Sequence, residues 1–214
     1  MTSVDLDLSV YLVTDRGLCG PRGVDDVVRA AIDGGATVVQ LRDPEAKTAA
    51  LLERARALVA LLRPAGIPLI INDRVDVALA AGAGGVHVGQ LDMPVAEARA
   101  LLGPQRILGL SISTLAQLDR AQLQYVDYLG VGPIFPTLTK PDASTPIYPS
   151  GLAAIIARSE LPIVAIGGLN AGNAGEAIRA GAQGVAVVSA ICAASDPRRA
   201  TRELADVVRA ARVH

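Results

Sequence analysis

The chain has 214 residues, of which 51% are hydrophobic and 19% are charged, a composition that supports a large core and argues against intrinsic disorder. Its net charge is −1 and it contains no long basic run, which argues against a nucleic-acid-binding protein. No apolar stretch is long enough to span a bilayer, no signal peptide is recognisable, and the two cysteines lack metal-like spacing, so we expect a cytoplasmic protein without a membrane partner.

Short apolar runs alternate with amphipathic segments along the whole chain. We predict strands at residues 10–15, 37–43, 67–73, 85–90, 107–113, 126–133, 162–168 and 184–191. The segments between them, such as "DDVVRAAIDGG", place apolar residues at helical spacing. Strands that alternate with helices indicate βαβ units and a parallel sheet.

The joints between these units recur in the sequence. Residues 80–90, "AAGAGGVHVGQ", and residues 179–189, "RAGAQGVAVVS", share a Gly-Ala helix ending followed by a strand entry, and residues 32–41 are a looser copy. Glycine at such a joint suits a left-handed helix cap and a tight turn. Eight similar units predict an α/β fold, a single (β/α)₈ TIM-barrel domain over residues 1–214. An open doubly wound sheet is the alternative, but no G-x-G-x-x-G motif follows the first predicted strand.

Polar side chains concentrate at the C-terminal ends of the predicted strands, which is where barrel enzymes place their active sites. In chain order these residues are Thr14, Asp15, Arg16, Gln40, Arg42, Asp43, Asn72, Asp73, Gln90, Asp92, Ser111, Ser113, Thr137, Thr139, Lys140 and Ser189. The opposite strand ends carry mostly glycine, alanine and proline. The sequence therefore predicts a functional site on one rim of the barrel.

Asp73 and Asp92 follow neighbouring strands and form a candidate metal site. Two carboxylates, completed by substrate phosphates and water, suit Mg²⁺. Each aspartate could instead cap the helix that follows it, and Pro94 stands where the first turn of such a helix would begin. Two aspartates on adjacent strand ends favour the metal.

Two further groups on the predicted rim suit anions. Gly167, Gly168, Val188 and Ser189 lie after the last two strands, where barrels often bind phosphate through backbone N–H groups. Thr137, Thr139 and Lys140 offer hydroxyls and an ammonium group that could clamp an anion. The alternatives are ordinary turn chemistry for the glycines and a solvated loop for the threonines and lysine. His87 lies within a predicted strand and is interpreted as a core or wall residue, not as a base.

The segments "YLVTD", "VVQLRD", "IIND", "GVHVGQLD", "LGLSIST", "VGPIFPTLTK", "IVAIGGL" and "AVVSAI" resemble, in order and spacing, those of the thiamine phosphate synthase family. The resemblance covers nearly the whole chain. That family joins 4-amino-2-methyl-5-hydroxymethylpyrimidine pyrophosphate to 4-methyl-5-(2-hydroxyethyl)thiazole phosphate, and so makes thiamine phosphate and pyrophosphate. The resemblance implies a Mg²⁺-dependent transferase with two small-molecule substrates.

The resemblance also implies roles for residues at matching positions. Asp73 and Asp92 would bind Mg²⁺; Gln40, Arg42 and Asn72 would contact the pyrophosphate or the pyrimidine; Ser111 would hydrogen-bond the pyrophosphate; Thr137, Thr139 and Lys140 would lie along the leaving group and the thiazole phosphate; and Gly168, Val188 and Ser189 would cradle the thiazole phosphate. Arg42, Ser111 and Lys140 are the expected catalytic residues.

The chain departs from the family pattern at two positions. Pro44 stands where the family usually has a pyrophosphate-binding lysine, and our hypothesis is that Lys47 or Arg16 partly substitutes. Ser113 stands where the family often has histidine. These departures keep open a non-catalytic barrel that binds thiazole phosphate. A thiazole tautomerase-like paralogue is a second alternative, although that group tends to have histidine where this chain has Ser113. The sequence also leaves open whether copies associate into a homo-oligomer.

Overall fold

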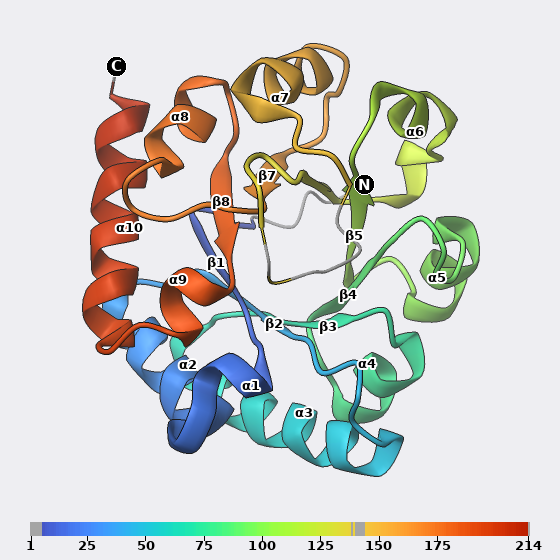
Figure 1. The fold of residues 1–214 in the computed structure, drawn as a ribbon. Helices are drawn as coiled ribbons and strands as arrows, with labels where there is room; N and C mark the ends of the chain where they lie inside the picture. Colours follow the sequence, from blue (N-terminus) through green and yellow to red (C-terminus); the bar gives the residue numbers. More distant parts are fainter. Residues whose placement is uncertain (1–5, 138, 140–143, 214) are drawn as a thin grey trace.

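A computed structural model describes residues 6–137, 139 and 144–213, so Lys140 lies outside the described residues. Eight parallel strands pair in chain order and close into a barrel (Figure 1). They are β1 (Val10–Val13), β2 (Val38–Leu41), β3 (Leu69–Asn72), β4 (Gly85–Val88), β5 (Ile107–Ile112), β6 (Tyr128–Val131), β7 (Ile163–Ile166) and β8 (Gly184–Val187). The predicted (β/α)₈ TIM barrel is confirmed, and the doubly wound alternative is excluded because β1 pairs with both β2 and β8.

Helices surround the barrel on its outside (Figure 1). They are α1 (Arg16–Cys19), α2 (Gly23–Gly34), α3 (Thr48–Leu62), α4 (Val75–Ala81), α5 (Val95–Leu102), α6 (Leu115–Arg120), α7 (Tyr148–Ile156), α8 (Ala174–Arg179), α9 (Ser189–Cys192) and α10 (Pro197–Arg212). Three short 3₁₀ turns add to them, Gly20–Arg22, Arg63–Ala65 and Leu123–Tyr125. The glycine joints take the expected form, because Gly35 and Gly82 cap α2 and α4 in the left-handed conformation.

Each predicted strand exists, but all eight are shorter than predicted. The largest error at a single strand end is at the eighth, predicted as residues 184–191, because β8 ends at Val187 and α9 begins at Ser189. The segment "VVSAI" is apolar in both settings, so its composition does not mark the point where the chain leaves the hydrogen-bond ladder. Val188 therefore precedes a helix and is not part of the strand.

Two apolar layers hold the barrel together. The inner layer fills the barrel with side chains that include Tyr11, Val38, Ile70 and Tyr128. The outer layer lies between the strands and the helices and contains most of the buried aliphatic residues. Because successive side chains of a strand point to opposite faces, both faces of each strand are buried, which explains the continuous apolar runs in the sequence.

Helix α10 follows α9 and lies beside α2 and α8 (Figure 1). It starts at a well-formed N-cap, where the Asp196 side chain accepts a hydrogen bond from the Arg199 N–H at 3.0 Å. Thr201, Leu204, Val208 and Ala211 form its buried stripe, at the spacing expected of an amphipathic helix.

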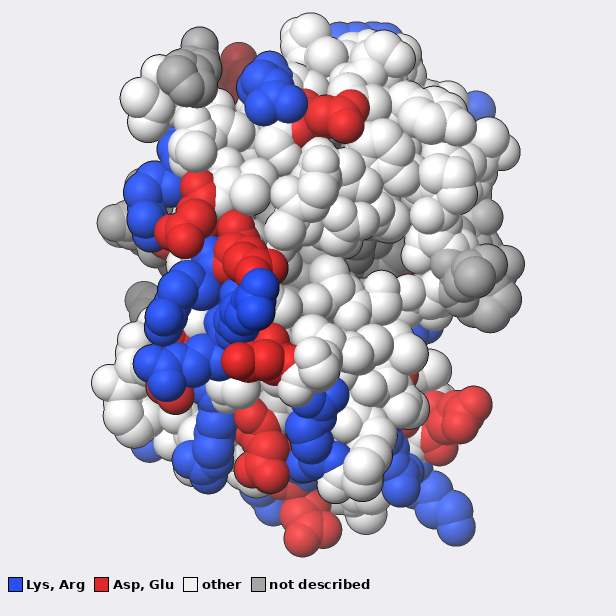
Figure 2. All heavy atoms as spheres, turned by 60° about the vertical axis from the view of Figure 1, so that its left-hand side comes forward, with Lys and Arg blue, Asp and Glu red and all other residues white. Residues whose placement is uncertain are grey.

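The exposed face of α10 carries charges of both signs. Figure 2 shows Lys and Arg side chains interspersed with Asp and Glu over this side of the molecule. Two ion pairs lie on the helix itself, Arg199 with Glu203 and Arg209 with Asp206. Within the described residues, no helix is both long enough and apolar enough to cross a membrane.

Candidate active site

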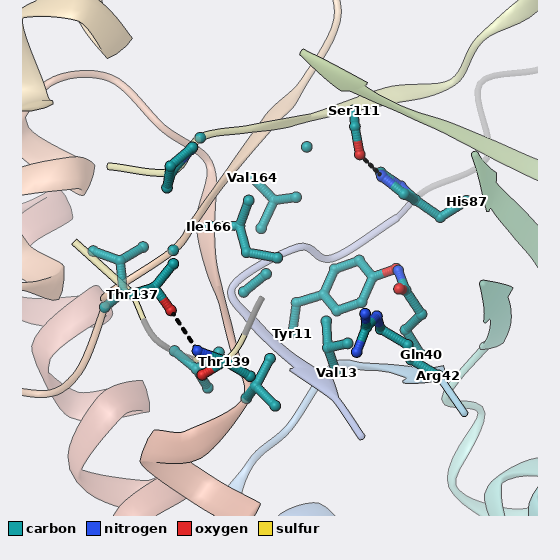
Figure 3. Close-up of a pocket in the computed structure, with 18 of the residues that line it drawn as sticks. Tyr11, Val13, Gln40, Arg42, His87, Ser111, Thr137, Thr139, Val164 and Ile166 are labelled. Carbon is teal, nitrogen blue, oxygen red and sulfur yellow. Dashed lines mark hydrogen bonds between the residues drawn. The ribbon is translucent and has the colours of Figure 1, made fainter. Parts of the chain in front are cut away.

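A pocket of about 210 Å³ opens at the C-terminal ends of the strands (Figure 3). Its wall includes nine of the residues to which the sequence assigned a binding role, namely Gln40, Arg42, Asn72, Ser111, Thr137, Thr139, Gly168, Val188 and Ser189. These residues come from six different strand ends and are brought together only by closure of the barrel. The structure thus assembles one continuous site from residues spread over 150 positions of the chain.

Asp73 lies directly after β3 and beside the pocket wall. Its backbone adopts a positive φ of 61°, which is uncommon for a residue other than glycine, and its N–H donates to the His87 carbonyl at 2.8 Å. The Asn72 amide donates to the Asp73 carboxylate at 2.6 Å. This geometry turns the carboxylate away from the following helix, since α4 has Arg74 as its N-cap and receives no side-chain cap.

Asp92 occupies the loop after β4. Its carboxylate accepts a hydrogen bond from the Gly89 N–H at 2.7 Å, which folds the loop back on itself. Helix α5 begins later, with Pro94 as its N-cap and no side-chain cap. The structure therefore excludes the helix-capping alternative for both aspartates.

The two carboxylates face each other. The pKa of Asp73 is raised from 3.8 to about 6, first by burial and then by the hydrogen bond and repulsion from Asp92, while Asn72 and Arg42 oppose the shift. Two carboxylates held this close share a proton or a cation, and hard oxygen donors of this kind suit a divalent metal. Among the described residues, no third His, Cys, Asp or Glu joins them. The pair therefore fits Mg²⁺, which commonly takes one or two carboxylates and fills its other positions with water and phosphate oxygens.

Arg42 follows β2 and lines the pocket. Its backbone N–H donates to the Thr14 hydroxyl at 3.1 Å, which fixes the end of β2 against the end of β1. Thr14 was predicted to lie on the rim, but its side chain is fully buried. Its role is therefore to hold the strand ends together and not to contact a ligand. The guanidinium lies close enough to Asp73 to lower the pKa of that carboxyl.

The floor of the pocket is a row of hydrogen-bonded side chains, of which Figure 3 shows Tyr11, Gln40, His87 and Ser111; the sequence predicted only Gln40 and Ser111 among them as site residues. The Gln40 amide donates to the Tyr11 hydroxyl at 2.8 Å, and the Tyr11 and Tyr128 hydroxyls are 2.8 Å apart. Tyr128 contacts His87 Nδ1 at 2.9 Å, and His87 Nε2 contacts the Ser111 hydroxyl at 2.8 Å. The interpretation of His87 as a wall residue is consistent with this position. Sequence analysis missed the two tyrosines because they lie inside apolar strands. The feature that could have identified them is a hydroxyl group at a strand position that points into the barrel.

The opposite wall of the pocket comes from β7, β8 and the loops after them. Gly168 adopts a φ of 66°, and a Cβ there would lie only 2.6 Å from the Pro136 carbonyl oxygen, so this position needs glycine. The Asn173 amide donates to the Gly168 carbonyl at 2.9 Å and holds the turn. Val188 and Ser189 line the same wall at the start of α9.

Two positions bear on the departures from the family pattern. Pro44 is exposed in the turn after β2, and Lys47 and Arg16 are exposed as well. None of these three residues lines the pocket. Ser113 does line it, and its N–H donates to the Gln117 side chain at 2.6 Å.

The comparisons with known proteins agree with one another. A family model described as thiamine monophosphate synthase matches residues 10–191. A thiamine-phosphate synthase of Xanthobacter autotrophicus is 60% identical over 206 residues, covering 96% of this chain and 98% of that protein. A thiamine-phosphate synthase of Chloroflexus aurantiacus is 54% identical over 203 residues, covering 95% of this chain and 94% of that protein. The solved structure of thiamine phosphate pyrophosphorylase from Pyrococcus furiosus has a TM-score of 0.88 at 40% identity, covering 96% of this chain and 98% of that one. The chain belongs to the thiamine monophosphate synthase family.

Proposed function

We propose that this chain is a thiamine-phosphate synthase. It would join the pyrimidine pyrophosphate to the thiazole phosphate and release pyrophosphate. The observation that carries this proposal is the 60% identity, over nearly the full length of both proteins, to a thiamine-phosphate synthase. The convergence of the expected binding residues on one pocket supports it independently.

We propose Asp73 and Asp92 as the ligands of Mg²⁺. Their mutual approach, which raises the pKa of Asp73 to about 6, is the electrostatic situation that a divalent cation relieves. When bound, the metal would neutralise charge on the leaving pyrophosphate. The carboxylates are held by Asn72 and by the Gly89 N–H, so they are oriented before substrate arrives.

The reaction places modest demands on the protein. The C–O bond to pyrophosphate breaks with its electron pair on the leaving group, and the electron-rich pyrimidine stabilises the carbon left behind. The thiazole nitrogen then donates its lone pair to that carbon, so no strong general base is needed. The pocket has to stabilise the leaving anion and hold the two substrates in line.

We assign the residues accordingly. Arg42, Ser111 and Lys140 donate to the leaving pyrophosphate and are the proposed catalytic residues; Lys140 rests on the sequence resemblance alone. Gln40 and Asn72 orient the pyrimidine from the β2 and β3 side of the pocket. Thr137, Thr139, Gly168, Val188 and Ser189 would hold the thiazole and its phosphate on the opposite wall.

We also propose that residues 1–214 form a single domain in the cytoplasm. The barrel strands run from Val10 to Val187, and α10 packs back against α2. The proposed substrates are small phosphorylated metabolites, which fits a pocket of this size. Whether copies associate into a homo-oligomer stays an open expectation.

The test is pyrophosphate release on mixing the purified protein with both substrates and Mg²⁺. We expect turnover that is abolished by EDTA, restored by added Mg²⁺, and reduced at least a hundredfold in Asp73→Asn. Omission of the thiazole phosphate is the control for simple hydrolysis. Binding of thiazole phosphate without turnover in the complete mixture would overturn the proposal in favour of a non-catalytic barrel.

A further inference from the structure

The side chains on the pocket floor form one continuous chain across the barrel: Gln40, Tyr11, Tyr128, His87 and Ser111. We propose that this row of hydrogen bonds sets the direction of every proton along it, so that Ser111 is held as a hydrogen-bond donor toward the pocket and the Gln40 amide is held in one orientation. Tyr11, Tyr128 and His87 are then positioning residues. The row of hydrogen bonds is inferred from geometry, whereas its consequence for catalysis rests on the proposed function.

Counting protons from Gln40 gives the direction. The Gln40 N–H donates to the Tyr11 hydroxyl oxygen, so the single Tyr11 proton points to Tyr128. The Tyr128 oxygen thus accepts from Tyr11, and its own proton goes to His87 Nδ1 at 2.9 Å. A neutral histidine that accepts at Nδ1 carries its proton on Nε2, and this N–H donates to the Ser111 oxygen at 2.8 Å. The Ser111 proton is left to point elsewhere, and Ser111 lines the pocket.

The surroundings are built to hold this chain. Tyr11 is 1% exposed and Tyr128 is fully buried, so water does not compete for their hydroxyls. A Cβ at Gly109 would lie 2.3 Å from the Tyr128 ring and 2.4 Å from His87 Nδ1, so β5 provides the space in which the two rings meet. Gly130 clears the other side of the His87 ring, where a Cβ would lie 2.9 Å from Cε1.

Burial also keeps the two phenols protonated. It raises the pKa of Tyr11 and of Tyr128 well above the ordinary value of 10.0. Each tyrosine hydroxyl therefore keeps its proton at any working pH. Each can accept one hydrogen bond and donate the next while staying neutral. A chain of this kind is more strongly ordered in a low-dielectric interior than in water.

The consequence for the reaction is a fixed pattern of donors and acceptors at the pyrimidine end of the pocket. Ser111 meets the substrate with an O–H, which can stabilise the charge that grows on the departing pyrophosphate. One N–H of the Gln40 amide is committed to Tyr11, which fixes the orientation of its carbonyl oxygen and of its second N–H. If the chain ran the other way, Ser111 would donate to His87 and present only lone pairs to an anion.

Nitrogen-15 NMR of histidine-labelled protein reads the chain directly. The sequence has two histidines, His87 and His214, so His214→Ala leaves a single labelled side chain. We expect neutral His87 with its proton on Nε2. A proton on Nδ1, or a doubly protonated ring, would overturn the proposal whether or not the protein turns over substrate.

A substitution at the far end of the chain is the sharper test. In Gln40→Glu the new carboxylate can only accept, so Tyr11 donates to it, Tyr128 donates to Tyr11, and the His87 proton moves to Nδ1. We expect this switch at pH 9, where the carboxylate is ionised, although position 40 does not touch His87. The double variant Gln40→Glu/Tyr11→Phe cuts the chain and should keep the proton on Nε2. The inference is contradicted if the His87 proton stays on Nε2 in Gln40→Glu, or if it moves to Nδ1 in both the single and the double variant.

Kinetics separate a directed chain from simple packing. Tyr128→Phe removes the group that holds the His87 tautomer, so we expect kcat to fall about tenfold in wild type and to change less than twofold in the Ser111→Ala background. Tyr11→Phe leaves Tyr128 able to donate to His87 and should reduce kcat by a similar factor in both backgrounds, through Gln40. Equal effects of Tyr128→Phe in the two backgrounds would mean a packing role only and would overturn the proposal. A protein that shows the NMR switch without turnover would refute the proposed function and leave the chain intact.

Discussion

At the scale of single residues, the site contains features that each lower the stability of the folded protein. Asp73 adopts a left-handed backbone conformation and faces a second carboxylate, and both features cost stability in the absence of a ligand. Local strain and like charge of this kind are typical of residues kept for binding. The structure therefore predicts that the metal-free protein is less stable than it could be.

Asp73→Asn tests this trade-off. The folded-state pKa of about 6 lies above the ordinary 3.8, so the folded protein binds the proton more tightly and loses stability as pH rises from about 4 to 6. Asparagine keeps the left-handed conformation and removes the repulsion. In EDTA at pH 7 we expect a higher Tm for Asp73→Asn than for wild type, and loss of the Tm increase that Mg²⁺ produces in wild type.

The control for this experiment is Asp33→Asn, an exposed aspartate on α2 outside the site. It should leave both the Tm and the Mg²⁺ effect unchanged. An Asp73→Asn variant that is less stable than wild type in EDTA would show that the two carboxylates do not repel each other in the folded protein.

At the scale of elements, the loop after β2 carries the clearest departure from the family pattern. Pro44 occupies the usual lysine position, and the candidate substitutes Lys47 and Arg16 lie outside the pocket wall. Arg42 is thus the single cation among the described residues that line the pocket. One charge-assisted hydrogen bond to an anion contributes about 1.5–3 kcal/mol.

We accordingly expect Pro44→Lys to lower the KM for the pyrimidine pyrophosphate by about tenfold. Pro44→Gln has similar length without the charge and should leave the KM within twofold of wild type, which controls for the loss of proline from the turn. Steady-state kinetics with the thiazole phosphate saturating give both values. Equal KM values for Pro44→Lys and wild type would support the hypothesis that Lys47 or Arg16 moves in to substitute.

The contact between α2 and α10 depends on a residue without a side chain. A Cβ at Gly34 would lie 2.4 Å from the Arg198 carbonyl oxygen and 2.6 Å from the Thr201 side chain. Gly34→Ala should therefore push the helices apart and reduce the free energy of unfolding by about 1–3 kcal/mol. Urea denaturation measures this loss, with exposed Asp33→Ala as a control expected to stay within about 0.5 kcal/mol of wild type. Equal stability of the two variants would show that α10 shifts without cost.

At the scale of the whole molecule, closure of the barrel joins the two ends of the chain. β1 pairs with β8, and α10 then covers this junction by packing against β1, α2, α8 and α9. The first strand and the last helix therefore stabilise each other, although they are far apart in sequence. Such non-local contacts make the folded state depend on both β1 and α10.

A truncation that stops at Asp196 tests this dependence. Removing α10 exposes the residues it buries on α2 and β1, so we expect loss of the cooperative thermal transition and aggregation during purification. Leu204→Ala, which removes one buried side chain of α10, should unfold cooperatively at a lower Tm. A truncated chain with the wild-type Tm would show that α10 contributes little to closure.

The fold and much of the site follow from the sequence alone. Alternating apolar runs and helical segments specify eight strand–helix units, because strands buried on both faces must be apolar throughout. Polar residues then stand out at strand ends, which is why Gln40, Asn72 and Ser111 could be predicted to lie on one rim. The specific family segments added the proposed substrates and the metal.

Tertiary structure decided what local sequence does not encode. The backbone turn at Asp73 decides that this aspartate faces Asp92 and does not cap α4. The local sequence around Asp73 is compatible with both arrangements. Tyr11, Tyr128 and His87 come from three different strands, and each resembles an ordinary core residue in its own segment. Their hydrogen bonds exist only because barrel closure sets the register of non-neighbouring strands, which is a property of the folded chain as a whole.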